Sequence, residues 1–425
     1  MNAVILMLIV FAVTIAIGIP IAAGLGISSI IALMSQGLPL FMVAQRMVTQ
    51  INTFTVMAIL FFILSGEIMC QGTMTEKLVN WAMAIVGHIR GGLAIAGGVA
   101  ATFFSALSGS SAATCASIGA IMIDKMSERG YPKAFSAATI ATTGITGIVI
   151  PPSVTFVVYG VVTGTSVKKL FAGGIIPGLL MAGSFMLVIW FYSKKRGYGA
   201  IQKFSLKYLA KETLRSIPVL MMPLIILGGI YGGIVTPNEA AVVSAVYAFI
   251  VTAVTDKTLT WKVMKKVLLK TVISTAVIIF IMQMAAAFSW VMTNARIPHI
   301  LGQWSAEIGA NKYMFLLAVN LVFLVAGMLI TGSAAVSILA PIFLPVALSY
   351  GLDPVFLGVV MICNLAIGYI TPPVGINLYL SATIAEVTIE DILKANMPFL
   401  IVALLCQAII TLVPQLSLII PNMIN

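Results

Sequence analysis

Long apolar runs constrain this chain more than any other feature of its sequence. Residues 4–25 and 397–420 contain no charged side chain, and each run has at least the roughly 20 residues that cross a bilayer as a helix. Of the 425 residues 61% are hydrophobic and only 8% are charged, whereas about a quarter are charged in a soluble domain. Soluble folds are therefore excluded, and the length leaves room for on the order of a dozen crossings.

The apolar runs are continuous rather than alternating, which favours membrane helices over the strands of a barrel. The net charge of +11 is concentrated in short loops and forms no basic stripe interleaved with aromatic residues, so nucleic-acid binding is not predicted. The basic segments 194–215 and 256–270 are expected on the cytoplasmic side. The first run lacks the basic start and cleavage site of a signal peptide, so we expect it to be retained as a membrane helix.

Three groups of residues that break helices recur in the same order at offsets of 222, 222 and 221 residues. We interpret them as a duplicated unit, with 1–215 as the first repeat and 216–425 as the second. The matched groups, first repeat before second, are 109–113 and 331–335, Pro132 and Pro354, and the proline pairs 151–152 and 372–373.

Each repeat is predicted to contain a re-entrant helical hairpin. Charged residues flank both ends of 91–124, so this first hairpin should enter and leave by the cytoplasmic face. The second hairpin, 313–350, follows a helix at about 271–293 that starts at a basic loop, so it should enter from the opposite face. The two repeats would then have inverted topology, with the hairpin tips meeting near the middle of the bilayer.

A broken helix is predicted after each hairpin. Proline fits the first turn of a helix but cannot continue one, so each proline pair should begin a second half-helix after a short unwound stretch. Unwound backbone in a membrane is tolerated only where it is buried in protein or lines a cavity. The breaks therefore predict the position of a binding region.

The chemistry available at these breaks suits a monovalent cation. Helix ends expose carbonyl oxygens, serine and threonine add hydroxyls, and neither hairpin tip carries a carboxylate, which favours sodium over calcium or zinc. The candidate ligands in the first repeat are Ser108, Ser110, Ser111, Gly144 and Gly147. Those in the second repeat are Thr331, Gly332, Ser333, Gly368 and Thr371.

The same breaks predict an anionic substrate, because a half-helix N-terminus attracts a carboxylate. Half-helices are expected to begin at Ser110, Ser333, Pro151 and Pro372. The candidate substrate contacts are Pro151, Pro152, Ser153, Pro372, Pro373 and Asn377, with Thr155 and Asn364 nearby. Close helix packing also explains clusters of small residues, but the coupling of each cluster to a Pro-Pro break favours binding.

Two isolated acids in apolar surroundings, Glu67 and Glu239, are functional candidates because ionisable groups are costly in a membrane. Both lie near predicted span ends, so we favour structural pairing. The four cysteines have neither disulfide nor zinc-site spacing. No phosphate-binding loop and no nucleophile with an orienting base occurs, so neither ATP hydrolysis nor an enzyme is predicted.

Several motifs together resemble the large membrane subunit of tripartite ATP-independent periplasmic (TRAP) transporters, over residues 1–420. This chain departs from many members at 331–333, where they carry an acid, and near Leu60, where they carry a proline. The motifs are Ser65-Gly66-Glu67, Gly87-His88 with Gly91-Gly92, 108–113, 150–153, Pro177-Gly178, 236–240 and 370–375.

The resemblance implies an all-α polytopic membrane protein of the bacterial inner membrane with an elevator-type ion transporter fold. Both hairpins and both broken helices would form a mobile transport domain, and the remainder would form a scaffold. It also implies sodium-driven import of a C4-dicarboxylate, sialic acid or other sugar acid without a cofactor, through the two sodium sites given above.

The implied partners are a small four-helix membrane subunit, expected here as a separate chain, and a periplasmic substrate-binding protein. The main alternative is a stand-alone sodium/dicarboxylate-type symporter that needs no binding protein. A channel and a membrane-embedded enzyme are weaker alternatives.

Overall fold

The chain is an all-helical bundle in this computed structural model, which describes residues 2–71, 73–200, 203–256, 258–307 and 311–424. Within these residues seven helices are long and apolar enough to cross a membrane, or eight if the bent pair α3–α4 forms one span. In chain order the helices are α1 (Asn2–Ala16), α2 (Ile21–Ser35), α3 (Phe41–Ile51), α4 (Val56–Met69), α5 (Met74–Val86), α6 (Gly92–Ser108), α7 (Ser111–Glu128), α8 (Lys133–Gly144), the 3₁₀ helix η1 (Ile145–Ile148), α9 (Val154–Thr163), α10 (Val167–Arg196), α11 (Leu206–Tyr231), α12 (Pro237–Val251), the π-helical turn η2 (Thr252–Asp256), α13 (Trp261–Asn294), α14 (Ile297–Glu307), α15 (Lys312–Leu329), α16 (Gly332–Ser349), α17 (Pro354–Gly368), α18 (Ile376–Ala385), α19 (Ile389–Leu412) and α20 (Gln415–Met423).

The number of long spans is smaller than the dozen expected from length, because several apolar runs are broken. The run 4–25 forms two helices rather than the single membrane helix expected, with Gly18 at φ 83° and Pro20 capping α2. The run 397–420 breaks likewise at Pro414, between α19 and α20. α1 and α2, like the half-helices α9, α17 and α18, are apolar but at 10–17 residues shorter than a span, whereas α19 remains long enough to cross.

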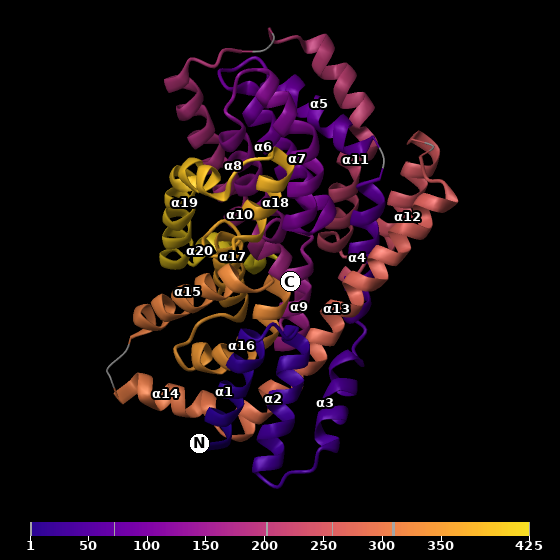
Figure 1. Cartoon of the computed structure of the whole chain (residues 1–425). Helices are drawn as coiled ribbons and strands as arrows, with labels where there is room; N and C mark the ends of the chain where they lie inside the picture. The colour runs from indigo at the N-terminus through magenta and orange to yellow at the C-terminus, as the bar shows by residue number, and fades with distance from the viewer. Residues whose placement is uncertain (1, 72, 201–202, 257, 308–310, 425) are drawn as a thin grey trace.

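The two predicted hairpins are present and approach from opposite ends of the molecule (Figure 1). Hairpin 1 consists of α6 and α7 and extends to Glu128, four residues beyond the expected 124. Hairpin 2 consists of α15 and α16 and matches the expected 313–350 to within one residue at each end. The inverted arrangement predicted from the repeats is thereby confirmed.

Both broken helices are also present, but their proline pairs lie elsewhere than predicted. α8 continues through η1 and resumes as α9 at Val154, and α17 resumes as α18 at Ile376. The proline pairs occupy the connecting loops, each with a cis Pro-Pro peptide bond, instead of the first turns of the half-helices. The prediction that half-helices begin at Pro151 and Pro372 is therefore wrong by three to four residues.

Packing gathers the hairpins and broken helices into one core. α8 contacts α6, α7, α18 and α19, while α17 contacts α15, α16, α10 and α19. The long helix α13 packs against α2, α3 and α4 and also touches α16, so it connects the two groups. The division into repeats 1–215 and 216–425, and into transport and scaffold domains, remains a prediction.

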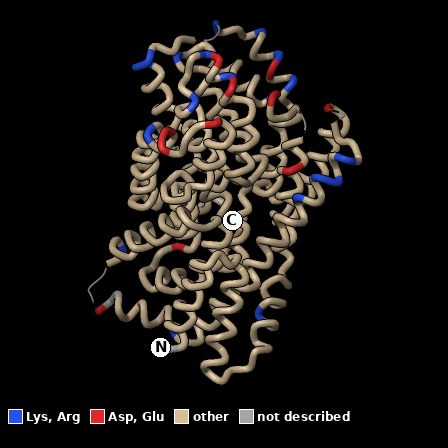
Figure 2. The backbone as a smooth tube through the Cα atoms, in the orientation of Figure 1, with Lys and Arg blue, Asp and Glu red and all other residues tan. Residues whose placement is uncertain are grey.

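Charged residues gather at one end of the molecule. Figure 2 shows most lysines and arginines around the 197–205 connection and the first turns of α11 and α13. Figure 1 shows hairpin 1 in the half of the molecule next to this end and hairpin 2 in the opposite half. The positive-inside rule predicts that this basic end is the cytoplasmic one.

Candidate functional site

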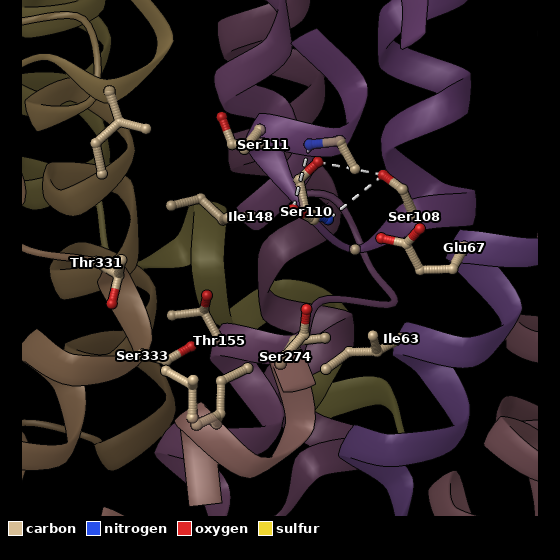
Figure 3. Close-up of a pocket in the computed structure, with 18 of the residues that line it drawn as sticks. Ile63, Glu67, Ser108, Ser110, Ser111, Ile148, Thr155, Ser274, Thr331 and Ser333 are labelled. Atoms are coloured by element: carbon tan, nitrogen blue, oxygen red, sulfur yellow. Dashed lines mark hydrogen bonds between the residues drawn. The ribbon is translucent and has the colours of Figure 1, made fainter. Parts of the chain in front are cut away.

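The tip of hairpin 1 is a short turn rich in serine. α6 ends at Ser108, Gly109 adopts φ 58°, and the side chain of Ser110 caps α7, which begins at Ser111. The hydroxyl of Ser108 donates to the Ser110 carbonyl at 3.2 Å (Figure 3) and lies 3.0 Å from the Thr114 hydroxyl. The tip therefore combines hydroxyl oxygens with the free N–H groups of a helix start.

The broken helix of the first repeat packs directly against this tip. A Cβ atom on Gly147 would lie 2.8 Å from the carbonyl oxygen of Ser110, and one on Gly109 would lie 2.9 Å from that of Pro152. Both neighbours are backbone atoms that cannot rotate away, so these positions require glycine. The structure thus brings Gly147 and two of the predicted serine ligands together.

The remaining glycine predicted for the first cation site, Gly144, lies beside Asn377. The fully buried Asn377 amide donates to the Ser111 hydroxyl at 2.8 Å and to the Ala141 carbonyl at 2.9 Å. A Cβ atom on Gly144 would lie 3.2 Å from that amide nitrogen. The Oδ1 atom of Asn377 is buried and has no hydrogen-bond partner among the described residues.

The tip of hairpin 2 is held by an aromatic hydroxyl. Thr331 precedes α16, and the N–H of Gly332 donates to the hydroxyl of Tyr369, just after α17. A Cβ atom on Gly332 would lie 3.0 Å from the same oxygen and 3.4 Å from the methyl group of Thr155. Hairpin 2 therefore touches the broken helices of both repeats.

The second set of predicted cation ligands is less compact than the first. Thr331, Gly332 and Ser333 share the tip, whereas Gly368 packs against the backbone of Gly327 in α15. The hydroxyl of Thr371 donates to the carbonyl of Ile367 at 2.7 Å. The structure thus brings three of the five residues together, and the binding of sodium by either set stays a prediction.

A cavity of about 400 Å³ lies between the two tips (Figure 3). Its wall includes the tip of hairpin 1, the start of α9, Ile63 to Glu67 on α4, and one face of α13 from Ile273 to Ile281. Ser108, Ser110, Ser111, Thr331 and Ser333 all line it. The cavity is the place where the hairpin tips of both repeats face the same space.

The predicted substrate contacts lie around this cavity rather than in its wall. Val154 and Ile376, the first residues of the two second half-helices, line it in place of the proline pairs. The described wall does not include Pro151, Pro152, Ser153, Pro372, Pro373 or Asn377. Asn364 is instead hydrogen bonded to Asn320 of α15 at 2.9 Å. In this geometry the predicted residues could affect a substrate only by positioning the half-helix starts that line the cavity. Their role in substrate binding remains a prediction.

Glu67 is the charged residue of the cavity wall among the described residues. Its carboxylate points toward the hairpin 1 tip (Figure 3) and pairs with Lys270 of α13 at 3.1 Å. Glu239 instead accepts from the N–H of Thr236 at 2.7 Å in a capping box at the start of α12. Both acids therefore have the structural partners that the sequence favours.

Sequence reasoning missed Tyr369, which lies in the cavity wall and bonds hairpin 2. The available signal was a phenol hydroxyl next to a helix break in an otherwise apolar segment. No group of three or more His, Cys, Asp or Glu side chains suited to a metal occurs within the described ranges. The predicted ligands at the two tips themselves are hydroxyl and carbonyl oxygens, which carry no charge.

Comparison with known proteins matches nearly the whole chain to one protein family. Residues 8–416 match the family described as "Tripartite ATP-independent periplasmic transporter, DctM component". A C4-dicarboxylate TRAP transporter large permease protein of Pseudomonas aeruginosa is 42% identical, covering 87% of this chain and 86% of the relative. A sialic acid TRAP transporter large permease protein of Vibrio cholerae is 36% identical, covering 89% of each chain.

A third relative is longer than this chain. The isethionate TRAP transporter permease protein DctMQ of Oleidesulfovibrio alaskensis is 40% identical over 96% of this chain but only 65% of its own length. Among solved structures, the Alcanivorax borkumensis YdaH transporter, described as having an unusual topology, superposes with a TM-score of 0.58 over 86% of each chain. At 14% identity that likeness concerns the fold alone.

Proposed function

Because the chain belongs to the DctM family of tripartite ATP-independent periplasmic transporters, we propose that it is the large membrane subunit of a sodium-coupled importer of an organic acid. The chain is a multi-pass membrane protein of a transporter family rather than of an enzyme family. The proposal adds the coupling ion, the substrate class, the elevator movement and the bacterial inner membrane as its location.

The observation that carries the proposal is the charge of the central cavity. Two hairpin tips and two half-helix starts direct N–H groups toward it, yet no lysine or arginine belongs to its described wall. Its charged wall residue is the acid Glu67. Because Lys270 already pairs with this carboxylate, the described wall offers an organic anion no net positive side-chain charge, and helix dipoles and a bound cation would together offset the anion's charge. Sodium and substrate then bind as partners, which is the basis of coupling.

The environment of Ser111 supports a cation at hairpin 1. The Oδ1 atom of Asn377 is a buried oxygen without a partner, and the amide group of the same side chain orients the Ser111 hydroxyl. A buried unpaired carbonyl oxygen is costly, and a sodium ion at the tip would relieve that cost. We therefore assign sodium to Ser108, Ser110, Ser111, Gly144 and Gly147, and a second ion to the corresponding tip and break of the second repeat.

The two sides of the cavity support an elevator mechanism. The hairpins and broken helices form one packed group, while α4 and α13 supply the opposite wall. Sliding of the first group along α13 would carry the cavity from one membrane face to the other, as expected for inverted repeats.

We further propose that the small four-helix membrane subunit is a separate chain and that a periplasmic binding protein delivers the acid. Two relatives named TRAP transporter large permease proteins, which match this chain over 86% and 89% of their own lengths, support this assignment. A C4-dicarboxylate, a sialic acid or another sugar acid is the expected substrate class.

Reconstitution tests the proposal. We expect purified chain and small subunit in proteoliposomes to accumulate labelled acid only with an inward sodium gradient and with the binding protein outside. Uptake without the binding protein would instead support the stand-alone symporter, and uptake that ignores sodium would refute the coupling.

A further inference from the structure

A second cavity lies directly beyond the central one. It has a volume of about 270 Å³ and is lined by α3, α13, α16 and the end of α9. Three helices, α9, α13 and α16, line both cavities. In the central cavity their lining residues include Thr155, Ile281 and Ser333. In the second cavity they include Val162, Met282 and Ser337. The second cavity is therefore the continuation of the first, one or two helical turns away from the basic end.

Arg46 is the charged residue that faces this second cavity among the described residues. It lies on α3, the first arm of the bent α3–α4 pair, and its guanidinium carbon is 5.4 Å from the centre of the Trp290 ring. The Nε atom of Arg46 is buried without a hydrogen-bond partner, and no described carboxylate forms an ion pair with the side chain. A guanidinium is always ionised, so in an apolar bundle it requires an anion.

The surroundings of Arg46 are suited to a small acidic group. Gln50 adds an amide to the wall, and Ser289 adds a hydroxyl from the same face of α13 as Trp290, whereas the Thr293 hydroxyl donates to the Ser289 carbonyl at 2.9 Å. A guanidinium binds carboxylate, sulfonate and phosphate oxygens with two parallel hydrogen bonds, while the indole face stacks on its other side. The wall thus offers both charge and directional donors.

We propose that the Arg46 cavity is a second anion-binding site, which holds the acidic group of the transported acid on the periplasmic approach to the central cavity. The identity of the occupant rests on the proposed function, because a lipid phosphate group has the same chemistry. The described wall of the central cavity has no basic side chain, and that cavity depends on sodium, whereas the Arg46 site binds an anion without sodium. The acid is thereby captured before the coupling ions are in place.

Trp290 provides a direct probe of occupancy. The chain contains five tryptophans, so the signal is the difference in emission between the wild type and Trp290→Phe. Succinate, isethionate and sialic acid are titrated separately in phosphatidylcholine nanodiscs and sodium-free buffer, which leaves the central cavity unloaded. At least one acid should give a saturable difference signal, which Arg46→Gln abolishes and Arg46→Lys weakens. Arg129→Gln, at an exposed position on the opposite side, should leave the signal unchanged.

Uptake measurements complete the test. Arg46→Gln should raise the KM for the acid about tenfold, the loss expected for one charge-assisted contact, without changing the sodium concentration for half-maximal uptake. A difference signal that appears only when phosphatidylglycerol replaces phosphatidylcholine would overturn the assignment to the acid in favour of lipid. A signal that survives in Arg46→Gln, or no response to any of the three acids, would overturn the site itself. Arg46→Lys keeps the charge and carries the test if Arg46→Gln does not fold. Because Arg46→Gln alters only the second cavity, a difference signal that it abolishes reports the Arg46 site whether or not transport proves to be sodium coupled.

Discussion

Replacing Gly147 by alanine should weaken sodium binding by pushing hairpin 1 away from the broken helix. The added Cβ would lie 2.8 Å from the carbonyl oxygen of Ser110 and 2.9 Å from the nitrogen of Ser111, both backbone atoms. Moving from 2.8 Å to an ordinary contact of 3.4 Å requires a shift of about 0.6 Å. Such a shift exceeds the roughly 0.5 Å within which a binding constellation must be held.

The expected loss follows from the cost of overpacking. Inserting a methyl group into a well-packed site costs about 1–3 kcal/mol. If the cost falls on the ion-bound tip, the sodium concentration for half-maximal uptake rises about fivefold to 150-fold, at about 1.4 kcal/mol for each factor of ten.

The assay is the sodium dependence of acid uptake into proteoliposomes at a fixed acid concentration. Gly183→Ala in α10 is the matched control, because a Cβ atom there would meet no atom within 4 Å. A Gly147→Ala protein that folds and has wild-type sodium dependence would refute the placement of a sodium site at this tip.

Four further substitutions test separate contacts. Ser111→Ala and Ser333→Ala each remove a proposed hydroxyl ligand and should raise the sodium concentration for half-maximal uptake; unchanged values in both would contradict the ligand sets. Tyr369→Phe removes the acceptor of the Gly332 N–H, a loss of about 1 kcal/mol, and should raise the KM for the acid about fivefold, whereas an unaltered KM would separate this bond from substrate binding. Gly368→Ala inserts a methyl group against the backbone of α15 and should lower the unfolding temperature in detergent, and a wild-type temperature would show that α15 and α17 can separate without cost.

Local signals in the sequence predicted most of the architecture. Residues 109–113 and 331–335 mark hairpin tips because a turn in an apolar run needs glycine or a capping hydroxyl, and that requirement is visible in one segment alone. The offset of about 222 residues then relates the repeats without knowledge of their contacts. Hairpin bounds are correct to within four residues for this reason.

The predictions are less accurate where a helix break lies inside an apolar run that is taken as one continuous helix. Gly18 and Pro20 split the first apolar segment, although both residues are ordinary helix-ending signals. The sequence predicts the proline pairs inside the half-helices, but the extended residue Ser153 separates the first pair from α9. Val374 and the left-handed Gly375 separate the second pair from α18. Proline reliably indicates that a helix is broken, but it indicates less reliably which residue begins the next helix.

Contacts between repeats could not be predicted from the sequence. Asn377 was expected at the substrate, but its position between Ser111 and Ala141 depends on how α18 packs on α7 and α8, elements more than 230 residues earlier in the chain. Tyr369 and the cavity beside Arg46 likewise depend on packing between distant helices. Local periodicity contains no information about such pairs.

Simultaneous measurement of radioactive sodium and labelled acid entering the same proteoliposomes tests the central claim most directly. With the small subunit and binding protein present, the account predicts that sodium and acid enter together, that neither enters at this rate without the other, and that choline cannot replace sodium. Acid accumulation that continues unchanged when choline replaces sodium would contradict it, because the central cavity, whose described wall contains no lysine or arginine, would then hold an anion without a bound cation.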